Sequence, residues 1–251
     1  GEEGVHMDTI RSMQFFLQKR GRGYVASILC NMRTLTKDDI GTAVEFHKRI
    51  TDEIGDADFF AEDNTLVDSI KGAGAVVGIF AEDRLIALRS ISYTDEFVDD
   101  AIEDLKLEDT ERTHVAVMDF CVTDSEYRGN NLQFVSYIFM ENILYPYRYH
   151  LHTTVSPKNV FSLNNILKCG FFTVGFKQKY GGHARFVLYK NLRYPTCVET
   201  KGHKEVLLRN YAYHPTVLDD GYVGYKVKHK AHGMAMLYGR PKQEEEAASE
   251  K

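Results

Sequence analysis

The spacing of apolar residues changes several times along the chain, and each change predicts a new element. Met7, Ile10, Met13 and Leu17 lie at near-helical intervals and predict an amphipathic N-terminal helix. Short apolar runs rich in β-branched and aromatic residues predict strands. These runs cover residues 25–32, 75–80, 85–93, 114–123, 149–155, 171–176 and 185–189.

Longer amphipathic stretches between these runs predict helices. They cover about residues 40–50, 61–71, 131–144 and 157–169. The run 114–123 is apolar on both faces, which indicates a central strand. Because this strand alternates with two helices and a further strand, we expect an α/β unit with a crossover connection. The flanking hairpins are antiparallel, so the predicted fold class is α/β with a central mixed sheet and helices on its faces.

The segment after residue 191 has a different pattern. Residues 206–213 and 222–238 are again rich in β-forming residues and predict a C-terminal β extension. Residues 222–238 combine strand-like composition with ample charge, which includes alternating lysines at 226, 228 and 230, as is typical of an edge or interface strand. This extension is therefore a candidate interface for a homodimer.

Composition narrows the class of protein without naming a function. Hydrophobic residues make up 43% of the 251 residues and charged residues 27%, which excludes wholesale disorder. The formal net charge is −5, and residues 1–6 and 243–251 carry all of it, so the global charge says nothing about a partner. No nucleic-acid partner is expected, because this charge balance gives no basic footprint for one. No apolar run reaches the roughly 18 residues of a membrane span. Four widely spaced cysteines without an export signal predict reduced thiols and a cytoplasmic protein.

A glycine-containing turn directly follows the predicted central strand. Residues 122–132, VTDSEYRGNNL, lead through Gly129 into the helix that begins near Asn131. Free N–H groups at a helix N-terminus bind anions, Gly129 permits close approach of a ligand, and Arg128 adds a positive charge. The segment predicts a pyrophosphate site made of main-chain amides, although an ordinary strand–turn–helix junction has the same pattern.

A second junction follows the next strand. Residues 154–163, TVSPKNVFSL, lead through Asn159 into a short helix, and Gly170 and Phe171 follow its end. Asn159 either caps this helix or offers its amide group to a ligand.

In this order and spacing, the two segments resemble the GNAT superfamily of N-acetyltransferases. The family signature (Q/R)xxGx(G/A) falls on residues 126–131, where Gly129 matches strictly and Glu126 and Asn131 depart from it. The second signature, an Asn, a small residue, a helix and Gly-Phe, falls on residues 159–171. The resemblance covers about residues 31–191 and implies a GNAT-like acyl-CoA N-acyltransferase fold.

On this basis the chain divides into five expected parts. They are a cloning remnant at 1–6, an N-terminal helical extension at 7–30, the acetyltransferase domain at 31–191, the C-terminal β extension at 192–242 and an acidic disordered tail at 243–251.

The resemblance implies a site for acetyl-CoA, or another acyl-CoA, as co-substrate, and no metal. The cofactor-binding residues that it implies are Phe120, Cys121 and Val122 along the pantetheine arm, Arg128, Gly129, Asn130, Asn131 and Leu132 at the pyrophosphate, and Asn159 and Ser162 near the thiol. The expected reaction transfers an acetyl group to a primary amine of a small molecule or a protein.

Candidate catalytic residues are few. Many family members carry a Tyr four residues before the Gly-Phe glycine, but this chain has Ile166 there, which cannot donate a proton. A buried carboxylate at Asp119, on the central strand, would have a raised pKa and could act as the base. Tyr180, on the late hairpin, is the second candidate, and each of the two could instead be a hydrogen-bonded structural residue. We expect the acceptor between residues 39–71 and the hairpin near Tyr180.

Two rival hypotheses concern other residues. His150 and His152 share one face of a strand and, with Cys169 or His183, would make a metal site. The basic run 226–230, KVKHK, would suit RNA or an acidic partner, or would keep an edge strand from aggregating.

The main alternative to an enzyme is a GNAT-like module that binds CoA, or regulates another protein, without catalysis. Ile166 and Asn131 depart from the family pattern and keep this alternative open.

Overall fold

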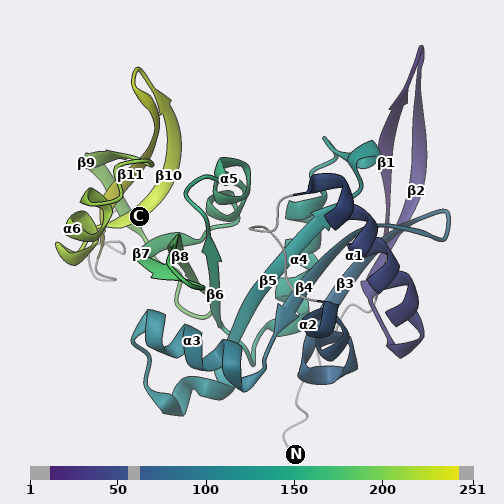
Figure 1. Ribbon diagram of the computed structural model, residues 1–251, viewed down its shortest axis with the longest axis horizontal. Helices are drawn as coiled ribbons and strands as arrows, with labels where there is room; N and C mark the ends of the chain where they lie inside the picture. The colour runs from purple at the N-terminus through teal and green to yellow at the C-terminus, as the bar shows by residue number, and fades with distance from the viewer. Residues whose placement is uncertain (1–11, 56–62, 243–251) are drawn as a thin grey trace, which may run out of the picture. The chain divides into compact units, whose positions relative to one another are not determined.

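The computed structural model describes residues 12–55 and 63–242, so the expected remnant at 1–6 and tail at 243–251 lie outside the described residues. The chain forms two compact units, whose elements are labelled in Figure 1. The first unit contains the described residues up to Thr94 and Met118–Tyr145. The second unit contains Asp95–Val117 and the described residues from Pro146 onward. Strand β5 (Val115–Thr123) contributes to both units.

Strands of the first unit follow the order β1-β2-β3-β4-β5. The pairs β1–β2, β2–β3 and β3–β4 are antiparallel. The strand bounds are β1 Ser12–Gly21, β2 Tyr24–Thr34, β3 Gly74–Ala81 and β4 Arg84–Ser92. The helical elements are η1 Lys37–Asp39, α1 Ile40–Ile54, α2 Asp63–Asp68, η3 Ser69–Ala73, η5 Ser125–Tyr127 and α4 Leu132–Leu144.

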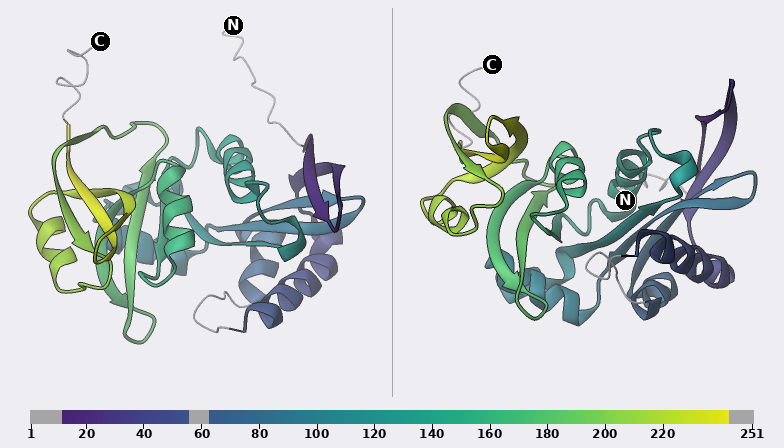
Figure 2. Two further views of the ribbon diagram at one scale, coloured as in Figure 1. Left: turned by 90° about the horizontal axis from the view of Figure 1, so that it is seen from above. Right: turned by 45° about the horizontal axis from the view of Figure 1, so that its top comes forward.

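Helices cover both faces of this sheet, with α1 and α2 on one side and α4 on the other (Figure 2). The α1–α2 side buries a cluster that includes Phe46, Ile50, Leu66, Val76 and Leu88. The α4 side buries a second cluster that includes Leu132, Phe139, Met32, Val77 and Ile79. Because β3 is buried on both faces, its sequence is a nearly continuous apolar run.

The second unit begins where β5 pairs in parallel with β6 (His150–Val155), from Val115 opposite His150 to Val117 opposite His152. Its strand order is β5-β6-β8-β7-β10-β11-β9. The remaining strands are β7 Phe172–Lys179, β8 His183–Asn191, β9 Val198–Leu207, β10 Val223–Lys230 and β11 Gly233–Pro241. The helices are α3 Asp95–Leu105, η4 Asp109–His114, α5 Val160–Lys168 and α6 Tyr213–Asp219.

The predicted fold class is confirmed, because parallel and antiparallel pairs occur together and helices flank the strands. The predicted helix at 61–71 begins outside the described residues and continues as α2 and η3. The boundaries predicted at residues 31 and 191 stay predictions. No helix in the described part of the chain is long and apolar enough to cross a membrane.

The predicted N-terminal helix is wrong for the residues that the structure describes. Ser12–Gly21 forms β1, an edge strand paired with β2 over its whole length. Met13, Phe15 and Leu17 pack in or against the cluster on the α4 side of the sheet. Their spacing of two residues is that of a strand. Phe16 is 71% exposed. Because it is an apolar residue at an exposed position, the sequence of β1 does not alternate cleanly between apolar and polar residues. The expected helical extension at 7–30 is thus a β-hairpin from residue 12, and residues 7–11 lie outside the described residues.

The C-terminal β extension is confirmed, although two of its details are wrong. Residues 222–238 form two strands, β10 and β11, which are joined by a turn at Ala231 and His232. Most of 206–213 is not a strand, because β9 ends at Leu207 and α6 follows. The buried side chain of His214 holds α6 by bonding the carbonyl oxygens of Leu207 and Leu208, a tertiary effect that overrides local β propensity.

Candidate functional site

The turn after β5 is fixed at its start by a buried carboxylate. Asp124 caps η5 by accepting a hydrogen bond from the N–H of Glu126 at 3.0 Å. Its Oδ2 lies 3.0 Å from Nη2 of Arg49 and 3.6 Å from Nη2 of Arg84. Burial alone would raise the pKa of Asp124, but the Glu126 N–H and the two arginines hold it below its usual value. Asp124 is therefore ionised at neutral pH and ties the turn to α1 and β4.

At the end of the turn after β5, two residues have backbone angles in the left-handed region. Gly129 has φ +84°, and Asn131, the N-cap of α4, has φ +58° without a side-chain cap. A Cβ on Gly129 would meet no atom within 4 Å, so the space beside it is open. No described residue accepts a hydrogen bond from the N–H groups of Gly129, Asn130, Asn131 or Leu132. These unused donors, at the start of a 13-residue helix, can bind an anion.

Arg128 and Asn130 flank the glycine and differ in their contacts. The side chain of Arg128 is exposed and forms no ion pair within the described residues. The side chain of Asn130 bonds Gln18 and the carbonyl oxygen of Tyr127. Arg128 can therefore place its charge on a ligand, whereas Asn130 has only its backbone N–H to offer.

The residues predicted to follow a pantetheine arm have partly buried side chains. Phe120 and Val122 pack against the cluster under α1, and the Phe120 ring lies 4.8 Å from the ring of His47. Sγ of Cys121 lies 4.0 Å from Oγ of Ser136 on α4. These packing contacts fix the side chains on the two faces of the strand. Leu132, the last predicted pyrophosphate contact, likewise buries its side chain and leaves only its N–H.

Asp119 has an uncompensated buried carboxyl oxygen. Its Oδ2 is shielded from solvent and has no hydrogen-bond partner among the described residues. Burial raises the pKa of Asp119 to about 7. A carboxyl group with this pKa gains and loses a proton near neutral pH. A general base needs this property, and the sequence analysis predicts it for Asp119. Its role in a reaction stays a prediction.

Asn159, predicted to lie near the thiol, is in the second unit and caps α5. Its Oδ1 accepts a hydrogen bond from the N–H of Ser162 at 3.1 Å, so this oxygen serves the helix. Ile166, at the position of the family tyrosine, is 7% exposed and packs inside the unit. The contact of Asn159 and Ser162 with a ligand stays a prediction.

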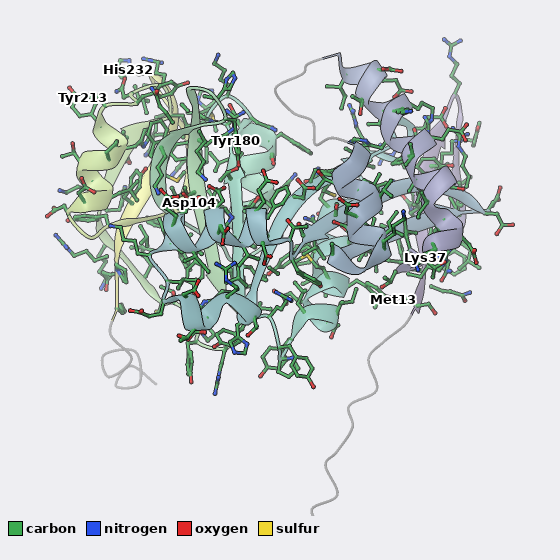
Figure 3. All side chains as sticks on the ribbon, turned by 60° about the horizontal axis from the view of Figure 1, so that its bottom comes forward. Met13, Lys37, Asp104, Tyr180, Tyr213 and His232 are labelled. Atoms are coloured by element: carbon green, nitrogen blue, oxygen red, sulfur yellow. The ribbon has the colours of Figure 1, made fainter. Side chains whose placement is uncertain are left out.

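Tyr180 lies in the turn between β7 and β8 with φ +51° and is 60% exposed (Figure 3). Its hydroxyl is 3.0 Å from Oγ1 of Thr154 on β6. Nζ of Lys179 and Cζ of Arg185 each lie 5.7 Å from the centre of its ring. The hydroxyl of Tyr180 is thus oriented by Thr154, and its ring lies near two cations.

The second unit also contains a buried ionic cluster that the sequence analysis did not predict. Asp104 on α3 (Figure 3) lies 2.8 Å from Nε2 of His152, 3.0 Å from Nζ of Lys177 and 2.7 Å from Nζ of Lys179. Burial would raise the pKa of Asp104, but these three partners lower it far more. Only the shared face of His150 and His152 indicated this cluster in the sequence, because no local pattern links residues 48 or more positions apart. The cluster ties α3 to β6 and β7.

The two histidines of the metal hypothesis have other partners. Nε2 of His152 is bonded to Asp104, and His150 lies 2.7 Å from the Tyr189 hydroxyl and 3.3 Å from Glu111. Within the described residues, no three His, Cys, Asp or Glu side chains gather as they would around a metal ion.

Of the predicted residues, the first unit brings together Asp119 to Val122 on β5 and Arg128 to Leu132 on the turn into α4. Asn159, Ser162 and Tyr180 belong to the second unit.

Comparison with known proteins returns structures only: no family model and no curated protein matches the chain. A GNAT-family acetyltransferase from Streptococcus pneumoniae is 14% identical, with a TM-score of 0.48 over 64% of this chain and 98% of that one. A GNAT-family acetyltransferase from Streptococcus agalactiae is 17% identical, with a TM-score of 0.48 over 64% and 95%. Arabidopsis thaliana NAA60, solved in complex with acetyl-CoA, is 12% identical, with a TM-score of 0.45 over 66% and 99%.

The matching structures include members of the superfamily that the two motifs resemble. At these identities and TM-scores, the likeness assigns no activity to this chain.

Proposed function

We propose that the chain is an acyl-CoA-dependent N-acyltransferase, which transfers an acetyl group from acetyl-CoA to a primary amine of a small molecule or protein. The observation that supports this best is the row of unused N–H groups from Gly129 to Leu132, beside open space at Gly129. Main-chain amides bind phosphate without requiring particular side chains, and the exposed Arg128 adds a positive charge. The resemblance of residues 126–131 and 159–171 to GNAT signatures favours CoA as the source of this phosphate.

The proposed transfer forms one bond and breaks one. The neutral amine nitrogen attacks the thioester carbonyl, so the C–N bond forms, the C–S bond breaks, and the electron pair leaves on the CoA sulfur. Asp119 takes the proton from the amine, since its pKa of about 7 leaves much of it ionised at neutral pH. Tyr180 is the proposed proton donor to the departing thiolate, because its hydroxyl is exposed and oriented by Thr154.

One observation favours a second candidate, a module that binds CoA without catalysis. Ile166 is buried and carries no hydroxyl where many GNAT enzymes have a tyrosine. The two candidates share the phosphate site and differ only in whether an acyl group is transferred.

Several finer expectations belong to the same proposal. Residues 56–62, which belong to the region expected to contact the amine acceptor, lie outside the described residues. The extension at 192–242 would carry a homodimer contact. The protein would work in the cytoplasm, without a nucleic-acid partner.

The variant Gly129→Ala tests the phosphate site. An added methyl group meets no protein atom, so its cost to folding is only the left-handed backbone, about 1 kcal/mol. It would occupy the space that the pyrophosphate needs, so we expect binding of acetyl-CoA, measured by calorimetry, to weaken about tenfold or more.

Gly202→Ala is the matched control. Gly202 has φ +69° and equally open surroundings, but it lies on β9. An unchanged affinity in Gly129→Ala, or no acetyl-CoA binding by the wild type, would overturn the proposal. Release of free CoA thiol in the presence of amines then separates the enzyme from the binding module.

A further inference from the structure

The side chain of Asn130 joins the turn after β5 to strand β1, 112 residues earlier in the chain. Its Oδ1 accepts a hydrogen bond from the backbone N–H of Gln18 at 3.0 Å, and its Nδ2 donates to the carbonyl oxygen of Gln18 at 2.9 Å. A second Nδ2 hydrogen bond goes to the carbonyl oxygen of Tyr127 at 3.0 Å. The carboxamide therefore has both hydrogens and its oxygen in use, and it pairs with β1 as a neighbouring strand would.

The position of Gln18 in the sheet explains why this contact is available. β1 is the edge strand of the first unit, as Figure 1 shows, and β2 occupies its other side. In an antiparallel pair, the N–H and C=O of one residue point to the same side, and every second residue shares that side. Because both groups of Gln18 bond Asn130, they face the open edge and take no part in the β1–β2 ladder.

Two further contacts hold the same turn against β1. Nζ of Lys19 lies 3.1 Å from Oε2 of Glu126 and 5.2 Å from the centre of the Tyr127 ring. Leu17 is buried in the same cluster as Tyr127 and Leu132. The ion pair is exposed and contributes little, so the two Gln18 hydrogen bonds and the apolar packing fix the position.

The turn is thus held at both ends and left free in its middle. Asp124 anchors its start through Arg49, and Asn130 anchors its end through β1. Between these anchors, Arg128 and Gly129 keep the groups that a phosphate would contact. A site whose donors are already in place loses less entropy when a ligand binds.

We propose that Asn130 is a positioning residue and that β1 forms part of the nucleotide end of the site. This inference rests on the proposed function. Asn130 acts through the backbone amides beside it, which bind the pyrophosphate. The protein then recognises acyl-CoA by its pyrophosphate and discriminates against acyl carriers that present pantetheine alone.

Two variants test this inference by calorimetry with CoA and with pantetheine. Asn130→Ala removes all three side-chain hydrogen bonds. Gln18→Pro removes the N–H that donates a hydrogen bond to Oδ1 of Asn130, and it leaves every residue of the turn unchanged. Proline is compatible with an edge strand. We expect each variant to weaken CoA binding about tenfold, or 1.4 kcal/mol, and to change pantetheine binding less than about twofold.

Each variant has a matched control. Gln14→Pro places the same residue on the same edge of β1, where no described hydrogen bond reaches the turn. Asn142→Ala removes an exposed asparagine of α4 whose amide bonds only the Ile138 carbonyl oxygen of its own helix. Both controls should bind CoA as the wild type does. If the wild type binds pantetheine too weakly to measure, it shows the expected discrimination, and the CoA affinities of variants and controls decide.

The outcomes separate this inference from the proposed function. A wild type that binds CoA, with Asn130→Ala and Gln18→Pro binding it equally well, overturns the positioning role alone. Equal losses for CoA and pantetheine would also overturn it, because they indicate general damage to the unit. A wild type that binds neither ligand overturns the proposed function and this inference with it.

Discussion

The buried carboxyl group of Asp119 lowers the stability of the folded protein when it is ionised, and it is also the proposed base. Burial raises its pKa to about 7, whereas an aspartate in an unfolded chain titrates near 4. Between these values the folded protein holds a proton that the unfolded chain has released. Stability therefore falls as the pH rises from about 4 to about 7, and the cost remains at higher pH.

Asp119→Asn should separate these two effects. The neutral amide has nearly the same shape, so at pH 8 we expect the variant to unfold at a higher temperature, with a gain of up to about 4 kcal/mol. This gain should shrink as the pH falls and vanish below about pH 4, where the wild-type carboxyl is protonated in both the folded and the unfolded chain. Acetyl transfer should fall by about 100-fold or more, because the amide cannot accept the proton.

Asp38→Asn serves as the control, since Asp38 is exposed and is not part of the proposed site. It should change neither stability nor rate. A wild-type rate in Asp119→Asn would remove this residue from the reaction, and equal melting temperatures at pH 8 would show that its charge is not costly.

The residue scale also shows which contacts a sequence can reveal. Gly129 and the helix after it lie within a few positions of each other, so their spacing predicts an anion site. Asn130 looked equally suited to bind the ligand, and its bond to Gln18 could not be predicted, because nothing near either residue encodes a contact 112 positions away. The Asp104 cluster could not be predicted either, because its members are also far apart in the sequence.

At the scale of elements, β1 is a strand whose sequence also fits a helix. Met13 and Leu17 are four residues apart, so they share a face in either structure. Phe15 and Phe16 decide between the two, because only a strand places Phe15 on the buried face with Met13 and Leu17. In the structure Phe15 packs against the α4 cluster, and Phe16 is 71% exposed.

Phe15→Ser and Phe16→Ser are therefore a matched pair of tests. We expect Phe15→Ser to lower the free energy of unfolding by about 1–3 kcal/mol, because it removes apolar packing. Phe16→Ser should stay within about 0.5 kcal/mol of the wild type. Urea denaturation measures both, and equal costs for the two variants would contradict the assignment of β1.

Elements with a single strong pattern were predictable, and elements that depend on distant contacts were not. β5 is buried on both faces at its start, so its apolar run could be recognised without any knowledge of its neighbours. The sequence of residues 222–238 predicts a single β stretch, because the turn at Ala231 and His232 carries no strong turn pair before Gly233. α6 depends on bonds from His214 to the β9 end, which a local pattern cannot show.

At the scale of the whole molecule, we expect the stability of the two units to respond to pH in opposite directions. Asp119 weakens the first unit as the pH rises. In the second unit, His214 is fully buried, with Nδ1 2.7 Å from the Tyr238 hydroxyl and Nε2 3.0 Å from the Leu207 carbonyl oxygen. The neutral ring satisfies both contacts, with Nε2 donating to the carbonyl and Nδ1 accepting from the Tyr238 hydroxyl, and burial favours it over the charged ring.

Burial lowers the pKa of His214, and it also lowers that of His150 in the same unit. An unfolded histidine titrates near 6.5, so below this pH the unfolded chain binds protons that the folded unit excludes. The second unit therefore loses stability as the pH falls from about 6.5 through the lowered folded values. The first unit gains stability over the same range, because Asp119 is then protonated.

Hydrogen exchange followed by mass spectrometry can test this opposition region by region. Between about pH 7.5 and about pH 5.5, corrected for intrinsic exchange rates, we expect amides of α6, β9 and β11 to exchange about twofold faster or more. Amides of β5 beyond Met118 should become better protected. His214→Gln keeps one donor and one acceptor without a titratable ring, so it should flatten the response of the second unit. A parallel loss of protection in both units would mean that they unfold together, and that neither Asp119 nor His214 sets the local pH response.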